Sequence, residues 1–390
     1  MSRNITLTVF FIAVFLQAGA YGLTFLLPDL FATFEADERA VGQMLGITAL
    51  ATITIVYYAG HLADLWGRLR TLSFACVSIA IALALFGNAS GNIIQLVIAS
   101  VLLGFGWGLT YALCPVVLTR LVTSEQGVRF FTMLSVFVMA GFGLSPVMAS
   151  LMFKLGFNIA DAFYVTSALC TISAILFWFL VDPIKNNAVN KSPEAPSRLS
   201  LANVALILKS PAWLPVTMVT FGAAVFAGLN NFQTVFAAER GLDFATYFLT
   251  YTITVVVLRL ILATFKGGKN PYMTIAYLQY VMAGAVVLFI FMGNSFPLYI
   301  LVAILFALGY GASYPILVAM AAADADKSLV PQTLQLFALT YFVGLFGFPL
   351  LAGTMLTNWG SLSVLIATVI MAAIEATLAL RRATQRRTPT

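Results

Sequence analysis

Four groups of hydrogen-bonding side chains interrupt otherwise apolar stretches of this sequence. Within each group the outermost residues stand three or four positions apart, so on an α-helix they share one face. Buried amide and hydroxyl groups need partners, which indicates an interior or wet face that hydrogen-bonds a solute while the rings hold its apolar part. The alternative is that the amides bond between helices and the rings pack. These polar–aromatic groups are Gln17 with Tyr21, Trp107 with Tyr111, Asn230 and Asn231 with Gln233, and Tyr310 with Tyr314.

Ionisable side chains are rare inside the same apolar stretches. Arg259 is the clearest case, and it can bind an anionic solute or a proton-linked acid, or snorkel to the membrane surface. Glu375 lies near the end of the last stretch, where we expect it to pair with Arg381 and Arg382. The four stretches that hold the polar–aromatic groups carry no acid at their middle, which favours a neutral, amphipathic or anionic organic solute over a cation.

The composition requires most of the chain to lie in lipid. Of 390 residues, 61% are hydrophobic and 9% are charged, which excludes a soluble enzyme, a disordered chain and a nucleic-acid-binding protein. A bilayer core needs about 20 apolar residues per helix. Twelve runs fit: Ile5–Leu27, Val41–Ala63, Thr71–Gly87, Ile93–Leu118, Phe130–Phe153, Ala162–Val181, Ala212–Ala237, Phe244–Phe265, Tyr272–Met292, Pro297–Ala321, Pro331–Met355 and Ser361–Leu380.

The basic residues predict the orientation of these spans. Twelve spans place both termini on one side, and sixteen of the twenty Lys and Arg residues fall there. The other side holds Arg39, Lys154 and Arg240. The positive-inside rule therefore predicts cytoplasmic termini in a multi-pass protein of the plasma membrane, the inner membrane of a bacterium. The longest loop, rich in Pro, Asn, Lys and Ser, predicts a linker over 182–210 between domains 1–181 and 211–390.

The two six-span halves repeat each other at an offset of 203 residues. This offset carries the Gly106–Tyr111 segment onto Gly309–Tyr314. It also carries a Gly and a Pro of the fifth span onto a Gly and a Pro of the eleventh, where we expect helix bends. Such a parallel repeat is typical of transporters whose halves move about a site at the membrane midplane. The four bend positions are Gly141, Pro146, Gly344 and Pro349.

The loop after the second span, Gly60–Leu72, resembles the signature of the major facilitator superfamily (MFS), G-x-L-a-D-r-x-G-r-k-x-x-l. Leu65 and Leu69 stand where the family has basic residues. The resemblance also covers the twelve spans, the halves and the linker. It implies the MFS fold, an all-α membrane protein of twelve transmembrane helices in two pseudo-symmetric six-helix bundles. The matching residues are Gly60, Leu62, Ala63, Asp64, Gly67, Arg68 and Leu72.

The resemblance also implies roles for particular residues. In the family, spans 1, 4, 7 and 10 surround a central cavity, which makes the nine residues of the polar–aromatic groups candidate substrate-binding residues. Gly60, Asp64, Gly67 and Arg68 would form a latch that joins the halves on the cytoplasmic side when the cavity faces outward. The alternative for this loop is a solvated turn that only sets orientation.

We expect a secondary active transporter that moves a small organic solute by alternating access, coupled to a proton or other ion gradient. Two alternatives stay open: a solute receptor or sensor that does not transport, and a flippase for a lipid-like substrate. No catalytic constellation, metal cluster or nucleotide loop stands out, so we expect no enzyme activity, no cofactor and no metal. The expected partners are the solute, the bilayer and protons, with no nucleic acid, and the expected state is a monomer.

Overall fold

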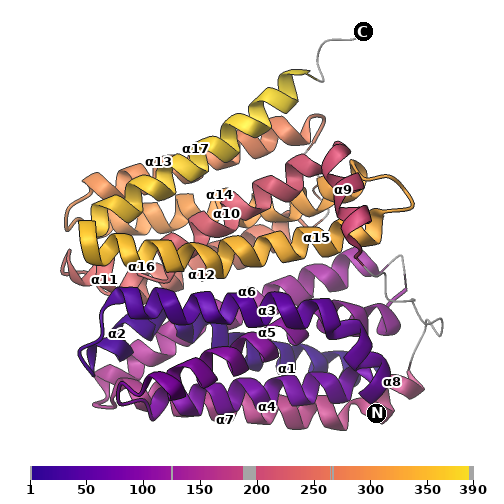
Figure 1. Ribbon diagram of the computed structural model, residues 1–390, viewed down its shortest axis with the longest axis horizontal. Coiled ribbons are helices and arrows are strands. Elements are labelled where there is room, and N and C mark those ends of the chain that lie inside the picture. Colours follow the sequence, from indigo (N-terminus) through magenta and orange to yellow (C-terminus); the bar gives the residue numbers. More distant parts are fainter. Residues whose placement is uncertain (1, 124–125, 188–198, 264, 266–267, 386–390) are drawn as a thin grey trace.

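A computed structural model describes residues 2–123, 126–187, 199–263, 265 and 268–385, and this part of the chain folds without strands, confirming the all-α prediction. Twelve segments in it are long and apolar enough to cross a membrane. Figure 1 shows them side by side along one axis. The helices are α1 Arg3–Leu23, α2 Leu27–Ala32, α3 Glu38–Trp66, α4 Arg68–Gly87, α5 Ile93–Leu121, α6 Gly127–Lys154, α7 Ile159–Phe179, α8 Val181–Asn186, α9 Leu201–Lys209, α10 Trp213–Asn230, α11 Gln233–Ala238, α12 Phe244–Ile261, α13 Pro271–Phe291, α14 Phe296–Ala323, α15 Val330–Phe342, α16 Phe348–Trp359 and α17 Ser361–Gln385.

Short polar side chains begin several of these helices. The carboxylate of Asp37 accepts from the Ala40 backbone N–H at 3.0 Å, and the Asn92 side chain accepts from Ile94 N–H at 3.0 Å. Asn158 forms a reciprocal capping box with Asp161 at the start of α7. These caps satisfy backbone donors that a helix start leaves open, which fixes where each span leaves the loop before it.

The bundle has two ends and two halves. Helices α1–α7 form the N-half and α10–α17 the C-half, stacked on each other in Figure 1, with α8 and α9 between them in sequence. We call the end that holds both termini the terminal end, and the opposite end, with α2 and α11, the far end. The middle of the predicted linker, residues 188–198, lies outside the described residues, as do 266–267 and 386–390.

The sequence repeat recurs in the helix packing. A side chain on Gly106 would lie 2.4 Å from Ile79 and 2.5 Å from the Ala75 carbonyl oxygen. Its counterpart Gly309 meets Met282 and the Leu278 oxygen in the same way, at 2.6 and 2.8 Å, and all three positions are shifted by 203 residues. Small residues allow helices to approach closely where lipid gives no hydrophobic driving force. The two halves therefore use the same contacts between their third and fourth spans.

Three spans are interrupted near their middle or far end. A 3-10 turn, Thr24–Leu26, separates α1 from α2 in the first span, just before Pro28. The seventh span breaks between α10 and α11 at residues 231–232. In the eleventh, a π-helical segment, Val343–Gly347, joins α15 to α16. Spans 1 and 7 hold corresponding places in the two halves, and such paired breaks are a frequent mark of transporter binding sites.

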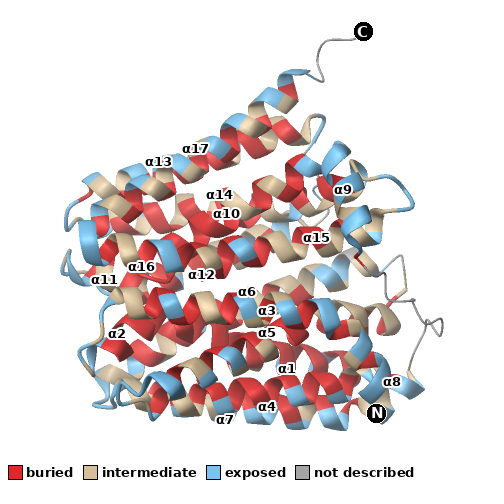
Figure 2. Cartoon of the chain, in the orientation of Figure 1, coloured by how far each residue is buried: buried red, intermediate tan, exposed pale blue. Residues whose placement is uncertain are grey.

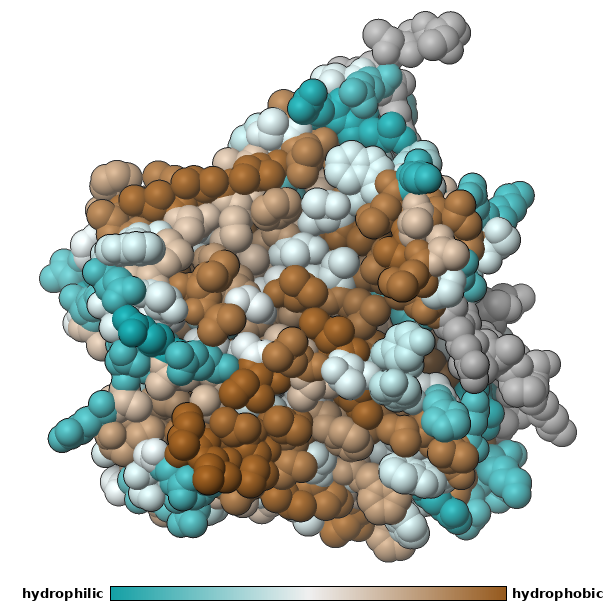
Figure 3. Space-filling view, in the orientation of Figure 1, coloured by the Kyte–Doolittle hydropathy of each residue, from teal (hydrophilic) through white to brown (hydrophobic). Residues whose placement is uncertain are grey.

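The surface fits a membrane environment. Figure 2 shows buried positions along the interior of the helix bundle, and exposed ones both at its two ends and along the outward faces of the helices. Apolar side chains cover much of the middle of the visible face in Figure 3, whereas hydrophilic ones gather toward the far and terminal ends. This is the distribution expected of helices whose middles face hydrocarbon.

Candidate functional site

Aromatic side chains fill the centre of the N-half. The Tyr21 ring of α1 stacks on Trp107 of α5, with ring centroids 5.2 Å apart, and lies 4.7 Å from Phe142 of α6. Tyr21 is 2% exposed and Trp107 is 4% exposed. Two of the predicted polar–aromatic groups thus meet on one surface. Phe142 was not predicted, because it lies on the fifth span, outside the four that the resemblance implies.

A matching cluster lies in the C-half. Phe226 of α10 stacks on Tyr310 of α14 at 4.5 Å, and the Tyr310 hydroxyl donates to the Tyr341 hydroxyl at 3.4 Å. Tyr341 also packs edge-on against Tyr314, with ring centroids 5.3 Å apart. Tyr341 carries the same signal in the sequence as Tyr310, a hydroxyl inside an apolar span. It was missed because it lies on the eleventh span.

The two clusters meet through a pair of tyrosines. The hydroxyls of Tyr111 in the N-half and Tyr314 in the C-half are 2.6 Å apart, within hydrogen-bonding distance. Their positions differ by 203 residues, the offset of the repeat, so the pair lies where equivalent faces of the halves oppose each other. Phe342 packs against Tyr111 at 4.7 Å and closes the contact from the side. Predicted substrate-binding residues from both halves are therefore neighbours at the centre.

Many polar atoms around this centre are buried without a hydrogen-bond partner among the described residues. Burying such an atom unpaired costs about 1–3 kcal/mol, so native proteins keep few of them. Their concentration between the halves indicates a place where a solute or water supplies the missing bonds. They are Gln17 Oε1, Trp107 Nε1, Asn230 Oδ1, Asn231 Oδ1 and Tyr251 Oη.

The predicted group on the seventh span is divided by the break in that span. Asn230 and Asn231 donate to backbone carbonyls one turn earlier in α10, those of Phe226 and Ala227, at 2.8 and 3.0 Å. Gln233 lies beyond the break and donates to the Tyr299 hydroxyl at 2.8 Å. The amide nitrogen of Gln233 therefore bonds between helices of the C-half, as the alternative interpretation expects, and the side-chain oxygens of all three residues have no hydrogen-bond partner among the described residues.

Arg259 joins the two halves next to the tyrosine pair. The helix ends at Ile261, so Arg259 lies in the last turn of α12, one turn nearer its end than the sequence indicated. Arg259 is 8% exposed, and its guanidinium donates to the hydroxyl and the carbonyl oxygen of Ser135 in α6. It is buried rather than snorkelling, and the described residues place no carboxylate in contact with it.

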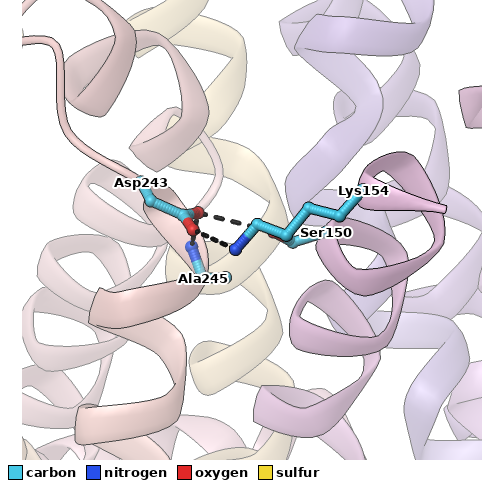
Figure 4. Close-up of polar contacts among 4 residues, drawn as sticks. All are labelled: Ser150, Lys154, Asp243 and Ala245. Atoms are coloured by element: carbon cyan, nitrogen blue, oxygen red, sulfur yellow. Dashed lines mark hydrogen bonds and ion pairs between the residues drawn. The ribbon is translucent and has the colours of Figure 1, made fainter. Parts of the chain in front are cut away.

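Polar contacts join the halves at the far end. Lys154 at the end of α6 forms an ion pair with Asp243, which begins α12, at 3.1 Å (Figure 4). Asp243 also accepts from the Ala245 backbone N–H at 2.9 Å, so one carboxylate both caps a helix and binds the other half. Arg39 donates to Asn358 at 2.7 Å across the same boundary. The far end is therefore closed in this conformation.

Glycines bring the halves together at the same end. A side chain on Gly42 of α3 would lie 2.4 Å from the Pro349 carbonyl oxygen, and one on Gly353 of α16 would lie 2.2 Å from the Glu38 oxygen. Nearer the middle, a side chain on Gly143 of α6 would overlap the Thr252 hydroxyl at 1.4 Å. Only glycine permits these approaches, so the closed far end depends on three small residues in facing helices.

Arg240 extends the polar layer of the far end within the C-half. Its guanidinium lies 4.6 Å above the Phe289 ring and 3.6 Å from the Glu239 carboxylate. Desolvation lowers the pKa of Arg240, and the negative charge of Glu239 acts in the opposite direction. Glu239 in turn accepts a hydrogen bond from the Ser361 hydroxyl, which ties α11 to the start of α17.

The predicted latch residues lie at the terminal end of the N-half. Gly67 alone separates α3 from α4, with φ at +86°, a conformation that favours glycine. Asp64 is exposed and Gly60 is half-buried. Gly67 and Arg68 line a pocket of about 360 Å³, together with Arg70, Arg120, Lys185 and five further residues, none of them acidic. The cross-half contacts described above lie at the far end and centre, away from this loop.

The four predicted bend residues lie in different structural settings. Gly141 packs on α1, where a side chain would lie 2.6 Å from the Phe15 carbonyl oxygen, and Gly344 packs on the Thr220 oxygen of α10 in the same way at 2.2 Å. Pro146 lies within an unbroken helix α6. Pro349 is in the first turn of α16, directly after the π-helical segment that contains Gly344.

The expected pairing of Glu375 with Arg381 and Arg382 is wrong. Helix α17 continues to Gln385, so Glu375 lies near its middle rather than at its end. It is 0% exposed, and both carboxylate oxygens are buried without a hydrogen-bond partner among the described residues.

Comparisons with known proteins agree with this architecture. The family model described as Major Facilitator Superfamily matches residues 9–349. A crystal structure of the human organic anion transporter MFSD10 (TETRAN) is similar with a TM-score of 0.67 and 13% identity, over 97% of this chain and all of that one. A structure of the nucleoside transporter NupG (D323A mutant) gives 0.71 and 16%, over 99% of this chain and all of the other. A search of curated proteins finds no match.

Proposed function

Because the chain belongs to the Major Facilitator Superfamily, we propose that it carries a small organic solute across the membrane by alternating access of its two halves. Membership of this family identifies the chain as a multi-pass membrane protein of the transporter class. The repeat in packing and the closed far end support a mechanism in which the halves move against each other and expose one site to each side in turn. This conformation is then the one closed at the far end.

The observation that carries the proposal is the hydroxyl contact between Tyr111 and Tyr314. It joins repeat-related positions of both halves, among buried polar atoms that lack partners. A solute entering between the halves would replace this single hydrogen bond and satisfy the unpaired amide and indole groups. Its rings would lie against Tyr21 and Trp107. We therefore place the substrate site between the two aromatic clusters.

The solute proposed is an organic molecule with a ring or apolar part and an anionic group. Arg259 supports the anionic group, because a buried guanidinium held only by Ser135 among the described residues keeps most of its donors available. The facing asparagine oxygens support additional hydroxyl or amide donors on the solute. The described fold neighbours include an organic anion transporter and a nucleoside transporter, which supplies a first panel of solutes to test.

The energy source proposed is a proton or other ion gradient. The alternatives are a receptor that binds solute without moving it and a flippase for a lipid-like substrate. The cross-half contacts favour transport over reception, because they form a closed end that can open only if the halves move.

The test is a flux screen with the purified protein in liposomes. Radiolabelled hippurate and uridine represent an anionic and a neutral ring-bearing solute, each assayed with and without a pH gradient. We expect protein-dependent uptake of at least hippurate, greater with the gradient, and lost in a Tyr111→Ala/Tyr314→Ala variant that folds. Binding without uptake would indicate a receptor, and scrambling of a labelled lipid without solute uptake would indicate a flippase.

A further inference from the structure

Glu375 is a carboxylic acid enclosed in the membrane-spanning part of the C-half. It lies two residues past the midpoint of the 25-residue helix α17. It has no exposed surface, and neither of its oxygens has a hydrogen-bond partner in the part of the chain that the structure describes. A carboxylate in an apolar interior without a partner is very costly, so this packing favours the neutral, protonated acid.

The helices packed around Glu375 place no charged side chain next to its carboxyl group. Its oxygens face Gly222 of α10, where a side chain would lie 3.1 Å from the nearer one. Helices α10 and α16 contain no titratable residue, and α13 contains only tyrosines, of which Tyr280 contacts Thr377 at 3.4 Å on the exposed side. On α17 itself, Arg382 shares the face of Glu375 but lies about 10 Å further along the axis, and Arg381 is exposed.

The corresponding interface of the N-half uses no acid. There the sixth span, α7, packs on the first, α1, and the Ser173 hydroxyl donates to the Ala13 carbonyl oxygen at 2.8 Å. A neutral, satisfied hydroxyl is therefore enough to hold these two spans together. The carboxyl group of Glu375 is an addition of the C-half that packing does not require.

Helix α10 lies between Glu375 and the central site. Gly222 lies beside the carboxyl group, where an added side chain would meet it, and Phe226, one turn further along α10, stacks on Tyr310 of the C-half cluster. The same helix then ends at Asn230 and the break of the seventh span. A displacement of α10 on opening or filling the central site would therefore change the cover over Glu375 and admit water to it.

We propose that Glu375 is the proton-binding site through which this chain couples solute movement to a pH gradient. In the conformation closed at the far end the group holds a proton. When α10 moves, the acid becomes hydrated, its O–H bond breaks, and the proton passes to water and leaves a carboxylate. The coupling role rests on the transport function proposed above, whereas proton binding by Glu375 does not.

Infrared difference spectroscopy tests proton binding without any solute. The purified full chain in lipid nanodiscs is titrated from acid to alkaline pH, and the carbonyl stretch of protonated carboxyl groups is recorded. We expect wild type to lose a band that Glu375→Gln never shows and that Asp29→Asn retains. Asp29 is the matched control, a half-buried acid near the far end of the first span. Identical spectra for wild type and Glu375→Gln, or no titrating band in wild type, would overturn the proposal.

Gradient-driven flux tests the coupling. For a solute that wild type moves in the liposome screen, uptake is measured with and without an inward proton gradient. We expect the ratio of uptake with the gradient to uptake without it to fall to one in Glu375→Gln. The ratio should stay as in wild type in Asp29→Asn, and Glu375→Asp should retain part of the stimulation by the gradient. A Glu375→Gln ratio equal to that of wild type would overturn the coupling role and leave the transport function intact. Absence of flux in wild type would instead contradict the transport function, with the infrared result still deciding proton binding.

Discussion

At the residue scale, the centre of the molecule combines a neutral hydrogen bond with a buried positive charge. The hydrogen bond between Tyr111 and Tyr314 contributes a net free energy of about 1 kcal/mol, because its hydroxyls bond to water when it is broken. Hydrogen bonds made by a charged group contribute about 1.5–3 kcal/mol. We therefore expect Arg259 to dominate the affinity for an anionic solute, and the tyrosines to adjust it.

Single Tyr111→Phe and Tyr314→Phe substitutions should each raise the Kd for a transported solute by about fivefold, the equivalent of one neutral hydrogen bond. Both remove only a hydroxyl and keep the ring contacts. The measurement is solute binding to purified protein in nanodiscs. Tyr277→Phe, at an exposed tyrosine of α13, is the control and should leave Kd unchanged. Unchanged affinity in both central variants would exclude these hydroxyls from the site.

Replacement of Arg259 by alanine should reduce binding of hippurate by roughly tenfold or more, because the charged donors are lost. Arg259→Lys should rescue only part of this, because an ammonium group lacks the planar fork that pairs with a carboxylate. Arg240→Ala, at the far end of the C-half, is the matched control. If hippurate binding survives in Arg259→Ala, the residue serves only to join α12 to α6.

The residues of this centre were predictable to different degrees. Tyr111, Tyr314, Trp107 and Tyr21 carry a clear signal, because a polar aromatic at helical spacing inside an apolar run has few structural reasons to be there. Gln233 carries the same signal, but its amide nitrogen donates to Tyr299 within the C-half, and residue spacing alone cannot distinguish such a contact from one to a ligand. The unpartnered state of a buried acid is equally invisible in sequence, since it depends on which helices surround it.

At the element scale, close packing of α3 on α16 and of α6 on α12 keeps the far end closed. Overpacking a tight contact costs about 1–3 kcal/mol, whereas an exposed ion pair contributes about 0–1 kcal/mol. The Lys154 and Asp243 side chains are 65% and 39% exposed. Glycine packing should therefore matter more than the ion pair for the balance between conformations.

Gly143→Ala should shift the protein away from the closed far end, because the new methyl group overlaps Thr252. The readout is the rate at which an impermeant maleimide modifies a cysteine at Ser150, a buried position beside Asp243. We expect a rate increase of roughly fivefold or more, the equivalent of at least 1 kcal/mol. Gly284→Ala, at a helical glycine with open space around it, should leave the rate unchanged. Equal rates in the two variants would mean that the far end does not open there.

Asp243→Asn should have a smaller effect in the same assay, about twofold, because the amide keeps the helix cap but loses the ion pair. High salt should reproduce the Asp243→Asn effect in wild type. A salt-independent rate would show that the ion pair does not hold the far end.

Element type and number followed from hydropathy, but the interruptions did not. A continuous apolar run predicts a span and gives no sign of a 3-10 turn at Thr24–Leu26 or a π-helical segment at Val343–Gly347. These breaks depend on tertiary contacts, such as the close approach of Gly344 to α10, rather than on local propensity. Pro28 and Pro349 were the local signals available, and only the second was interpreted as a bend.

At the scale of the whole molecule, the repeat offset organises both the fold and the site. The 203-residue offset relates Gly106 to Gly309 in the packing of each half and Tyr111 to Tyr314 at the centre. Under the proposed alternating access, the closed far end and the exposed Asp64 at the terminal end describe one of two conformations. Alternating access requires a second conformation, in which the far end opens and the terminal end closes.

The most direct test measures two distances between spin labels across the halves in nanodiscs. One pair, at the exposed residues Leu155 and Asn294, spans the far end, and the other, at Ile5 and Thr384, spans the terminal end. Each pair is measured in wild type and Gly143→Ala, with and without a transported solute. We predict that the far-end distance lengthens as the terminal-end distance shortens. Two distances that stay fixed, or change in the same direction, while the same protein transports solute would contradict alternating access of the halves.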